Sequence, residues 1–380
     1  RDRLRSRGLG DVYKRQEEET VINLTVKPGM KQGWFGNAYG GYGSKDRYEG
    51  NAMVNRFVNN DQITFMGGAN NTNNMGFSDL ASTMFSGMGG GGGRRGGFGA
   101  GSGITSSGNA GLNFSKEFKP DKLTLGGNTR YSHSDNDARS KSDRQNILPG
   151  DSSSYDNSEA MSRTKSDNFG VDFRLEWKPD TMTQLIFRPS FSFSHSMNDN
   201  FSDATTLDNE RDTVNTNKSS NYSESNGYNL NASIDFSRKL NNKGRVFSAT
   251  LSGGNSDSYS DGMNRSDIVY FNQTDALKNS IIDQRSRYDN KGFNYRAYVS
   301  WVEPIGHNNF IQATYSISQR KQEALKNVYN QDADGIYNVL DSAYSQSYRN
   351  NFISQRASLS FKSQRAKFNY TIGLNLDPSY

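Results

Sequence analysis

Cysteine is absent from the 380-residue chain, and only three histidines occur. The missing thiols exclude disulfide bonds and thiolate metal sites. Long apolar runs are missing too, because no stretch approaches the roughly 18 apolar residues of a membrane-spanning helix. Hydrophobic residues make up only 32% of the chain, and the mean hydropathy is −0.88. A helical membrane protein is therefore excluded, whereas strands that alternate apolar and polar residues barely register on hydropathy.

Aromatic residues are plentiful in this polar chain. They form 12% of it, with 20 Tyr and 22 Phe beside 38 Gly. Disordered chains are poor in aromatic residues, so disorder does not suit the whole chain. Aromatic side chains pack well on a pleated sheet and favour strands. The length suits two or three soluble domains or one large β-structure.

The net charge of +5 comes mainly from the first 16 residues. That segment, "RDRLRSRGLGDVYKRQ", holds six Lys or Arg against two Asp, and the remainder has 39 basic and 38 acidic residues. Residues 1–16 resemble a translated sequencing adapter, so we treat them as non-native and exclude them from fold reasoning. We expect the natural N-terminus to be missing. Nucleic-acid binding loses its electrostatic support and is not expected.

Period-two alternation recurs along the rest of the chain. In "GVDFRLEWKPDTMTQLIFRPSFSF" (170–193), large apolar residues occupy every second position on both sides of a polar turn. Such alternation is typical of strands with one apolar and one polar face. We count about 13 strands and expect no long amphipathic helix.

The lengths of the links between strands alternate. Short links are predicted at 43–46, 58–61, 119–122, 178–182, 241–244, 303–308 and 362–366, and long polar links at 72–104, 134–164, 198–222, 257–284 and 326–345. Outer-membrane barrels have short periplasmic turns and long outward loops. We therefore predict an all-β fold: an antiparallel transmembrane β-barrel, incomplete, with about 13 strands of a larger barrel.

The barrel hypothesis assigns each side of the strands to a different solvent. Apolar residues should face lipid and charged residues should face the aqueous lumen, because lipid offers no partner to polar groups. The residues predicted to face lipid are Val171, Phe173, Leu175, Trp177, Leu185, Phe187, Tyr295, Val299, Trp301, Tyr370, Ile372 and Leu374. The residues predicted to face the lumen are Asp172, Arg174, Glu176, Arg188, Asp235 and Arg296. These six either line a permeation path or only keep the lumen hydrated.

Two stretches resemble a known family. "ETVINLTVKPGMKQGWFGN" (19–37) resembles the end of the plug domain of TonB-dependent receptors, with Val21, Ile22, Asn23, Leu24, Thr25 and Lys27 in the pattern and the Thr one place early. "RYEGNAMVNRF" and "NNTNNMGFSDL" (47–57 and 70–80) resemble the first barrel strands of allied large outer-membrane β-barrel proteins. The resemblance implies that 17–30 ends a plug domain and that 31–380 is a partial outer-membrane barrel.

The resemblance also implies a function. It suggests energised uptake of a nutrient such as an oligosaccharide, siderophore or peptide across the outer membrane of a Gram-negative bacterium. The implied partners are outer-membrane lipid, a TonB-type energising protein in the intact protein and a surface lipoprotein. We expect neither an enzyme nor a cofactor. The alternatives are another outer-membrane barrel, either an adhesin or a barrel enzyme, and a secreted soluble β-protein.

Three local motifs receive simpler interpretations. The glycine-rich stretch 86–103 contains one Arg pair, too little for an RNA-binding segment, and we expect a loop. His133 and His195 have serine neighbours that suggest a Ser–His pair, but serine is frequent throughout and rim histidines are favoured; His307 completes the set. "NQDADG" (330–335) resembles a calcium loop without the acidic twelfth residue, and a solvated loop is favoured.

Overall fold

The computed structural model describes residues 32–73, 103–147, 153–271, 279–306, 308–365 and 368–378. Fourteen β-strands account for the regular structure in these ranges. They are β1 (Gln32–Tyr42), β2 (Tyr48–Val58), β3 (Asp61–Asn70), β4 (Ile104–Lys119), β5 (Leu123–Asn146), β6 (Ser154–Trp177), β7 (Thr183–Leu207), β8 (Thr213–Lys239), β9 (Val246–Tyr270), β10 (Asn279–Pro304), β11 (Asn309–Gln331), β12 (Tyr337–Leu340), β13 (Gln346–Gln364) and β14 (Asn369–Leu376). No described residue belongs to a helix with the length and apolarity needed to cross a membrane.

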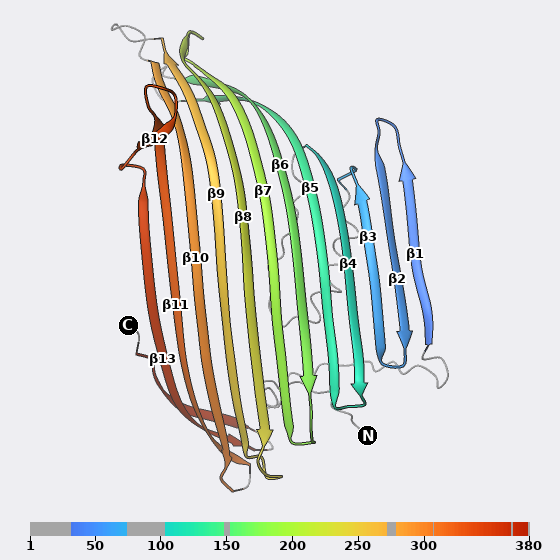
Figure 1. The fold of residues 1–380 in the computed structure, drawn as a ribbon. Helices are drawn as coiled ribbons and strands as arrows, with labels where there is room; N and C mark the ends of the chain where they lie inside the picture. The colour runs from blue at the N-terminus through green and yellow to red at the C-terminus, as the bar shows by residue number, and fades with distance from the viewer. Residues whose placement is uncertain are drawn as a thin grey trace.

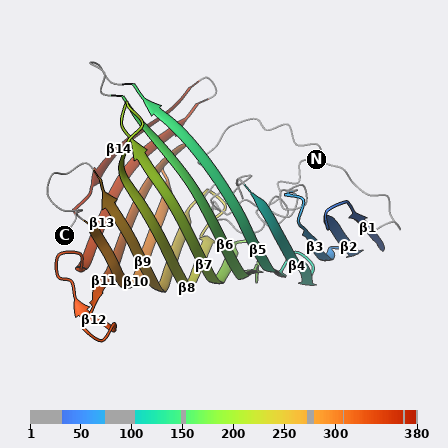
Figure 2. The same ribbon diagram turned by 90° about the horizontal axis from the view of Figure 1, so that it is seen from above.

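The strands form one antiparallel meander in which each strand lies beside its neighbours in sequence. The short strand β12 departs from this order and pairs only with β11. The long strands run side by side and bend together, so that the sheet is curved (Figures 1 and 2). The predicted all-β antiparallel class is confirmed, with 14 strands in place of about 13.

The sheet is open over the described residues. β1 pairs with β2 alone and β14 pairs with β13 alone, and the two edge strands lie apart (Figure 2). The sequence predicts an incomplete barrel, and the described strands form an antiparallel sheet that does not close. Nor do the described strands form a second sheet that stacks on the first.

The short turns fall where the sequence predicts them, and local chemistry explains two of them. Asn59 has a φ of 56° in the link between β2 and β3, a left-handed conformation that asparagine tolerates in tight hairpins. In the link after β6, the Asp180 carboxylate accepts hydrogen bonds from the backbone N–H groups of Met182 and Thr183, both at 2.7 Å. An aspartate that bonds its own following backbone stabilises such a turn.

The predicted long polar links between β5 and β11 are wrong, because strands occupy most of them. The ladder between β5 and β6 runs without interruption from Leu123 opposite Trp177 to Asn146 opposite Ser154. The predicted loop at 134–164 is therefore a hairpin with a link at 147–153. The error has a physical cause. These strand ends lack apolar alternation, and their ladders are stabilised instead by polar cross-strand pairs.

Several predictions concern residues outside the described ranges. They are the adapter-like segment 1–16, the plug-end segment 17–30 with its motif at Val21–Lys27, most of the glycine-rich stretch 86–103, and His307.

Hydrogen exchange tests the length of the strands. We expect backbone amides in 134–137 and 157–167 to exchange slowly, because each segment pairs with a neighbouring strand on both sides. Exchange of the full chain in detergent, followed by mass spectrometry, measures this. Exchange as fast as that of an unstructured peptide in these two segments would contradict the extended hairpin.

Candidate functional site

Alternate side chains give the sheet two chemically different faces, which we call the Val171 face and the Asp172 face after two neighbours on β6. Apolar residues on the Val171 face meet in register across the strands. Leu175 lies opposite Phe187, and Phe187 lies opposite Ile234. The row continues from Ile234 to Leu251 on β9 and reaches strands on both sides of this centre. This arrangement forms a continuous apolar band.

The band crosses the sheet from β1 to β14. Its large members are Trp34, Val54, Ile63, Phe65, Leu112, Phe114, Leu123, Leu125, Tyr131, Phe169, Val171, Phe173, Leu175, Trp177, Leu185, Phe187, Phe191, Phe193, Tyr228, Leu230, Ile234, Phe236, Phe247, Leu251, Phe293, Tyr295, Val299, Trp301, Ile311, Tyr315, Ile317, Ile353, Leu359, Phe361, Tyr370, Ile372, Leu374 and Leu376. All 12 residues predicted to face lipid are among them.

The apolar band is exposed rather than packed in a core. Phe173 is 41% exposed, Trp177 is 48% exposed and Leu374 is 76% exposed. A soluble monomer seldom exposes a contiguous apolar patch larger than a few hundred Å². A surface of this kind marks contact with a membrane or with a partner.

The height of the band along a strand, and the angle at which the strands cross it, both follow from the register of the sheet. On β6 it runs from Phe169 to Trp177, or roughly nine residues, and a transmembrane strand needs about 9–11. The lower edge of the band shifts along the strands from one side of the sheet to the other. It lies at Ile63 on β3 and at Tyr370 on β14, and across the ten strand-to-strand steps between them it shifts by roughly ten residues relative to the hydrogen-bond register. From the rise per residue and the spacing between neighbouring strands, this shift means that the strands are tilted by roughly 35° from the normal to the band.

Most of the charged residues on the Asp172 face at the level of the band form ion pairs with neighbours. Arg130 forms an ion pair with Asp172 at 2.9 Å, and Arg188 forms one with Asp235. The Thr250 hydroxyl donates a further hydrogen bond to Asp235 at 2.8 Å.

Two other predicted lumen residues, Arg174 and Glu176, bond each other at 3.1 Å. Arg296 lies instead against the Tyr298 ring, 6.0 Å from its centroid. All six predicted lumen residues thus occupy the Asp172 face. Arg130 also lies on the Asp172 face but is not among the residues predicted to face the lumen. The alternation of apolar and polar residues along β5 would have assigned it to this face.

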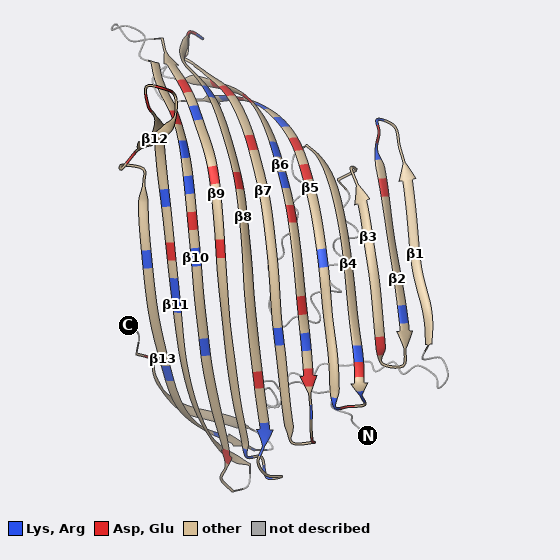
Figure 3. Cartoon of the chain, viewed as in Figure 1, with Lys and Arg blue, Asp and Glu red and all other residues tan. Residues whose placement is uncertain are grey.

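Above the band the Val171 face becomes charged. Asp135, Asp137, Arg139, Lys141 and Asp143 occupy successive positions of this face on β5. Figure 3 shows residues of both signs concentrated in the upper halves of β5 to β10. Many pair across strands, as Lys141 does with a glutamate of β6 at 2.8 Å.

The Asp172 face above the band carries small neutral polar residues instead. One cross-strand row consists of Ser134, Ser166, Ser196, Ser225 and Ser260 on five successive strands. Within it the Ser225 hydroxyl donates a hydrogen bond to the Ser260 hydroxyl at 2.8 Å. This part of the sheet therefore presents charges on one side and hydroxyl and carboxamide groups on the other.

Ion pairing lowers the pKa of carboxyl groups in this upper region. The pKa of Asp135 lies below its usual value because Arg163 donates two hydrogen bonds to the carboxylate, at 3.0 and 2.7 Å. Hydrogen bonds from Arg285 lower the pKa of Asp261 in the same way, with Arg287 nearby.

Two of the histidines, His133 and His195, contact polar side chains of neighbouring strands. His133 Nδ1 lies 2.8 Å from the Asp167 carboxylate, and His195 Nδ1 lies 2.8 Å from the Asn226 side-chain oxygen. Neighbouring serines point to the opposite face because successive side chains alternate.

In "NQDADG", Asp332 accepts hydrogen bonds from the N–H groups of Asp334 and Ile336 at 3.0 and 2.9 Å, and these bonds lower its pKa. The carboxylate therefore closes a turn. The described residues contain no group of three or more His, Asp or Glu arranged to hold a metal ion.

Comparisons with known proteins give a weak structural similarity only. No protein-family model and no curated protein matches the chain. Among solved structures, the alcaligin outer-membrane receptor FauA from Bordetella pertussis is 10% identical with a TM-score of 0.18 over 90% of this chain. The unliganded ferric citrate transporter FecA is 7% identical, again with a TM-score of 0.18 over 90%. The chain spans 61% and 65% of the lengths of these two structures.

The pair of Asp261 and Arg285 gives a prediction about pH. Because the folded-state pKa of Asp261 is depressed, the pair stabilises the upper sheet above the ordinary carboxyl pKa of 3.8 and loses this effect as the pH falls further. We expect an NMR titration of the Asp261 side-chain carbon to give a midpoint below 3.8. The Arg285→Gln variant should return the midpoint toward 3.8; an unchanged midpoint would exclude this cause.

Proposed function

We propose that the sheet is part of the wall of an outer-membrane β-barrel of the TonB-dependent receptor type, which carries a nutrient inward across the outer membrane of a Gram-negative bacterium. The observation that carries this proposal is the oblique apolar band on the Val171 face. The band crosses every long strand of the meander, and a lipid bilayer can cover an apolar surface of that width.

Three features of the band support a place in a bilayer. Its height of roughly nine residues equals a transmembrane strand, and its tilt of roughly 35° lies at the edge of the 35–45° typical of membrane barrels. Trp177 and Tyr131 stand at its lower and upper ends on adjacent strands, where aromatic girdles mark the interfaces. The sheet also satisfies backbone hydrogen bonds between strands, as lipid requires.

The Asp172 face supports a wet interior. Most of its charges are neutralised in pairs such as Arg188 with Asp235, and the rest of this face is largely serine, threonine and asparagine. A lumen of this kind would admit a polar solute such as an oligosaccharide, siderophore or peptide. The proposal requires further strands to pair the open edges of β1 and β14, because a spanning sheet must close.

Partners and mechanism rest on the family resemblance. We assign the intact protein a transport role without catalysis, with energy relayed by a TonB-type protein and substrate delivered with a surface lipoprotein. A complete plug with a TonB-contacting box upstream of residue 17 would support this role. A signal peptide that leads directly into β1 would favour an adhesin or a barrel enzyme.

A charge placed on the band tests the membrane position. We expect Leu175→Arg to lower the free energy of unfolding in lipid vesicles by about 2 kcal/mol, because Leu175 lies within the band and arginine is costly there. Its neighbour Arg174 belongs to the Asp172 face, so Arg174→Leu should cost far less. Leu175→Ala controls for the loss of packing. Equal costs of Leu175→Arg and Arg174→Leu, or a chain that folds fully without lipid or detergent, would favour the secreted soluble protein.

A further inference from the structure

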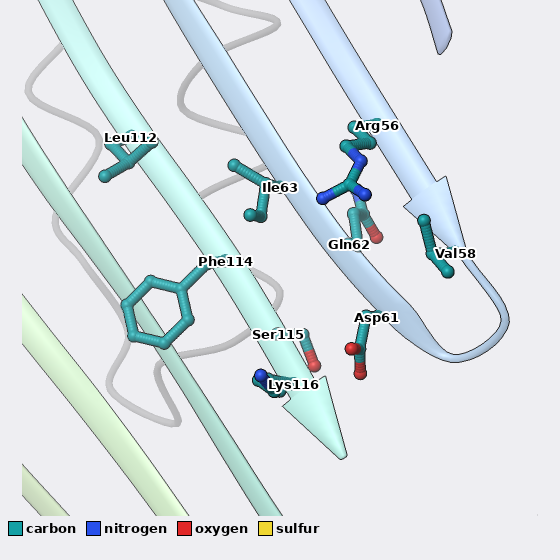
Figure 4. Close-up of a pocket in the computed structure, with 9 residues that line it drawn as sticks. All are labelled: Arg56, Val58, Asp61, Gln62, Ile63, Leu112, Phe114, Ser115 and Lys116. Atoms are coloured by element: carbon teal, nitrogen blue, oxygen red, sulfur yellow. The ribbon is translucent and has the colours of Figure 1, made fainter. Parts of the chain in front are cut away.

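A groove of about 310 Å³ lies on the lower part of the sheet across β2, β3 and β4. Its apolar wall is formed by Ile63, Leu112 and Phe114, which belong to the apolar band. Figure 4 shows Ile63 between Arg56 on β2 and the two β4 side chains. The groove therefore lies within the surface that the proposed function places against lipid.

Two cations flank this apolar wall. Arg56 lies opposite Ile63 in register, and its guanidinium stands 5.6 Å from the centre of the Trp34 ring. Lys116 is on the other side of the groove, on β4, with its ammonium 5.2 Å from the centre of the Phe118 ring. Among the described residues, both cations contact aromatic rings and neither has a carboxylate within ion-pair distance.

One acidic group stands between the cations. Asp61 lines the groove at the start of β3, and its carboxylate accepts a hydrogen bond from the backbone N–H of Glu117 at 2.9 Å. Within the described ranges no hydrogen bond reaches the second carboxylate oxygen of Asp61, which could accept one from a ligand. The groove thus offers two positive groups, one negative group and an apolar wall that continues upward into the band.

We propose that this groove binds a phospholipid whose headgroup carries both a phosphate and a primary ammonium group. The backbones at Arg56 and Lys116 are roughly 12 Å apart, from two strand spacings and an offset of two residues along the strands. Their long side chains would hold the phosphate between them, and Asp61 would accept a hydrogen bond from the ammonium. An acyl chain would lie along Ile63, Leu112 and Phe114. Charge complementarity favours this zwitterionic lipid over a purely anionic one because Asp61 would repel the latter. The inference rests on the proposed function, since the groove meets lipid only if the band does.

Tryptophan fluorescence can report the bound lipid, because Trp34 adjoins Arg56. The chain has three Trp, so Trp177→Phe and Trp301→Phe leave Trp34 as the sole reporter. Phosphatidylethanolamine with brominated acyl chains is added at a small fixed fraction to unbrominated phosphatidylcholine vesicles that contain the full chain. A second sample receives brominated phosphatidylcholine at the same fraction.

We expect the brominated phosphatidylethanolamine to quench Trp34 with an apparent affinity about threefold to fivefold higher than that of brominated phosphatidylcholine, the range that exposed charge pairs provide. Its quaternary ammonium gives phosphatidylcholine no hydrogen bond to donate to Asp61. The double variant Arg56→Gln, Lys116→Gln should weaken quenching by both lipids, because both carry the phosphate that the two cations hold. Asp61→Asn removes the charge that distinguishes the two headgroups, so it should remove most of the preference while leaving quenching by both lipids. Arg238→Gln, a basic residue of the lower end outside the groove, is the matched control and should change nothing.

The outcomes separate the two proposals. Equal quenching by both lipids, a preference that survives Asp61→Asn, or quenching that the double variant leaves unchanged would overturn the lipid site alone. A separate experiment with vesicles made entirely of brominated lipid tests whether the band contacts lipid at all. If they fail to quench Trp34, the band does not meet lipid, and the proposed function fails together with the site.

Discussion

Successive side chains of a strand point to opposite faces, while its backbone groups bond to the strands on either side. A sheet built in this way satisfies its backbone without any second layer. The side chains are then free to meet different surroundings on the two faces, and this protein uses that freedom along its whole meander. Leu175 and Phe187 stand in register on one face while Arg174 and its ion-pair partner occupy the other.

On the long strands β5 to β11, the apolar band ends many residues before the strands do. Above Phe193 the same face of β7 continues with His195, and the ladder with β8 persists to Leu207. In the proposed membrane position, the part of the sheet above the band extends out of the membrane. Both of its faces then contact water, so both can be polar. Paired charges such as Arg163 with Asp135 then stabilise one side, and serine rows cover the other.

The sequence predicts the strands and faces well where apolar residues alternate, because burial in lipid or protein imposes that pattern directly. It predicts turns where Pro, Asn or Asp restricts the backbone, as Asp180 does. It fails for the upper halves of β5 to β11, because polar stretches of this composition are typical of loops as well as of solvated strands. The signal was present as alternation of charge, with Asp135, Asp137 and Arg139 separated by neutral residues.

For the candidate site, too, some features could be predicted from the sequence and others could not. Assignment of residues to the two faces of the sheet needed only the period of two: the 12 residues predicted to face lipid share the Val171 face, and the six predicted to face the lumen share the Asp172 face. Pairing across strands, as between Arg130 and Asp172, depends on register between segments some 40 residues apart and could not be obtained from local pattern. The groove at Arg56 and Lys116 likewise joins three strands, one of them beyond a long link.

Spin-label accessibility along β7 measures the central claim most directly, and the absence of cysteine from the chain makes single labels simple to place. With the protein in lipid vesicles, labels at successive positions from 185 to 193 should alternate with period two between access to oxygen, which dissolves in lipid, and access to a water-soluble nickel chelate. From 195 upward both faces should be open to the chelate. Equal access of the chelate to Leu185, Phe187 and Phe191 and to the residues between them would show that water surrounds the band, contrary to the proposed membrane position.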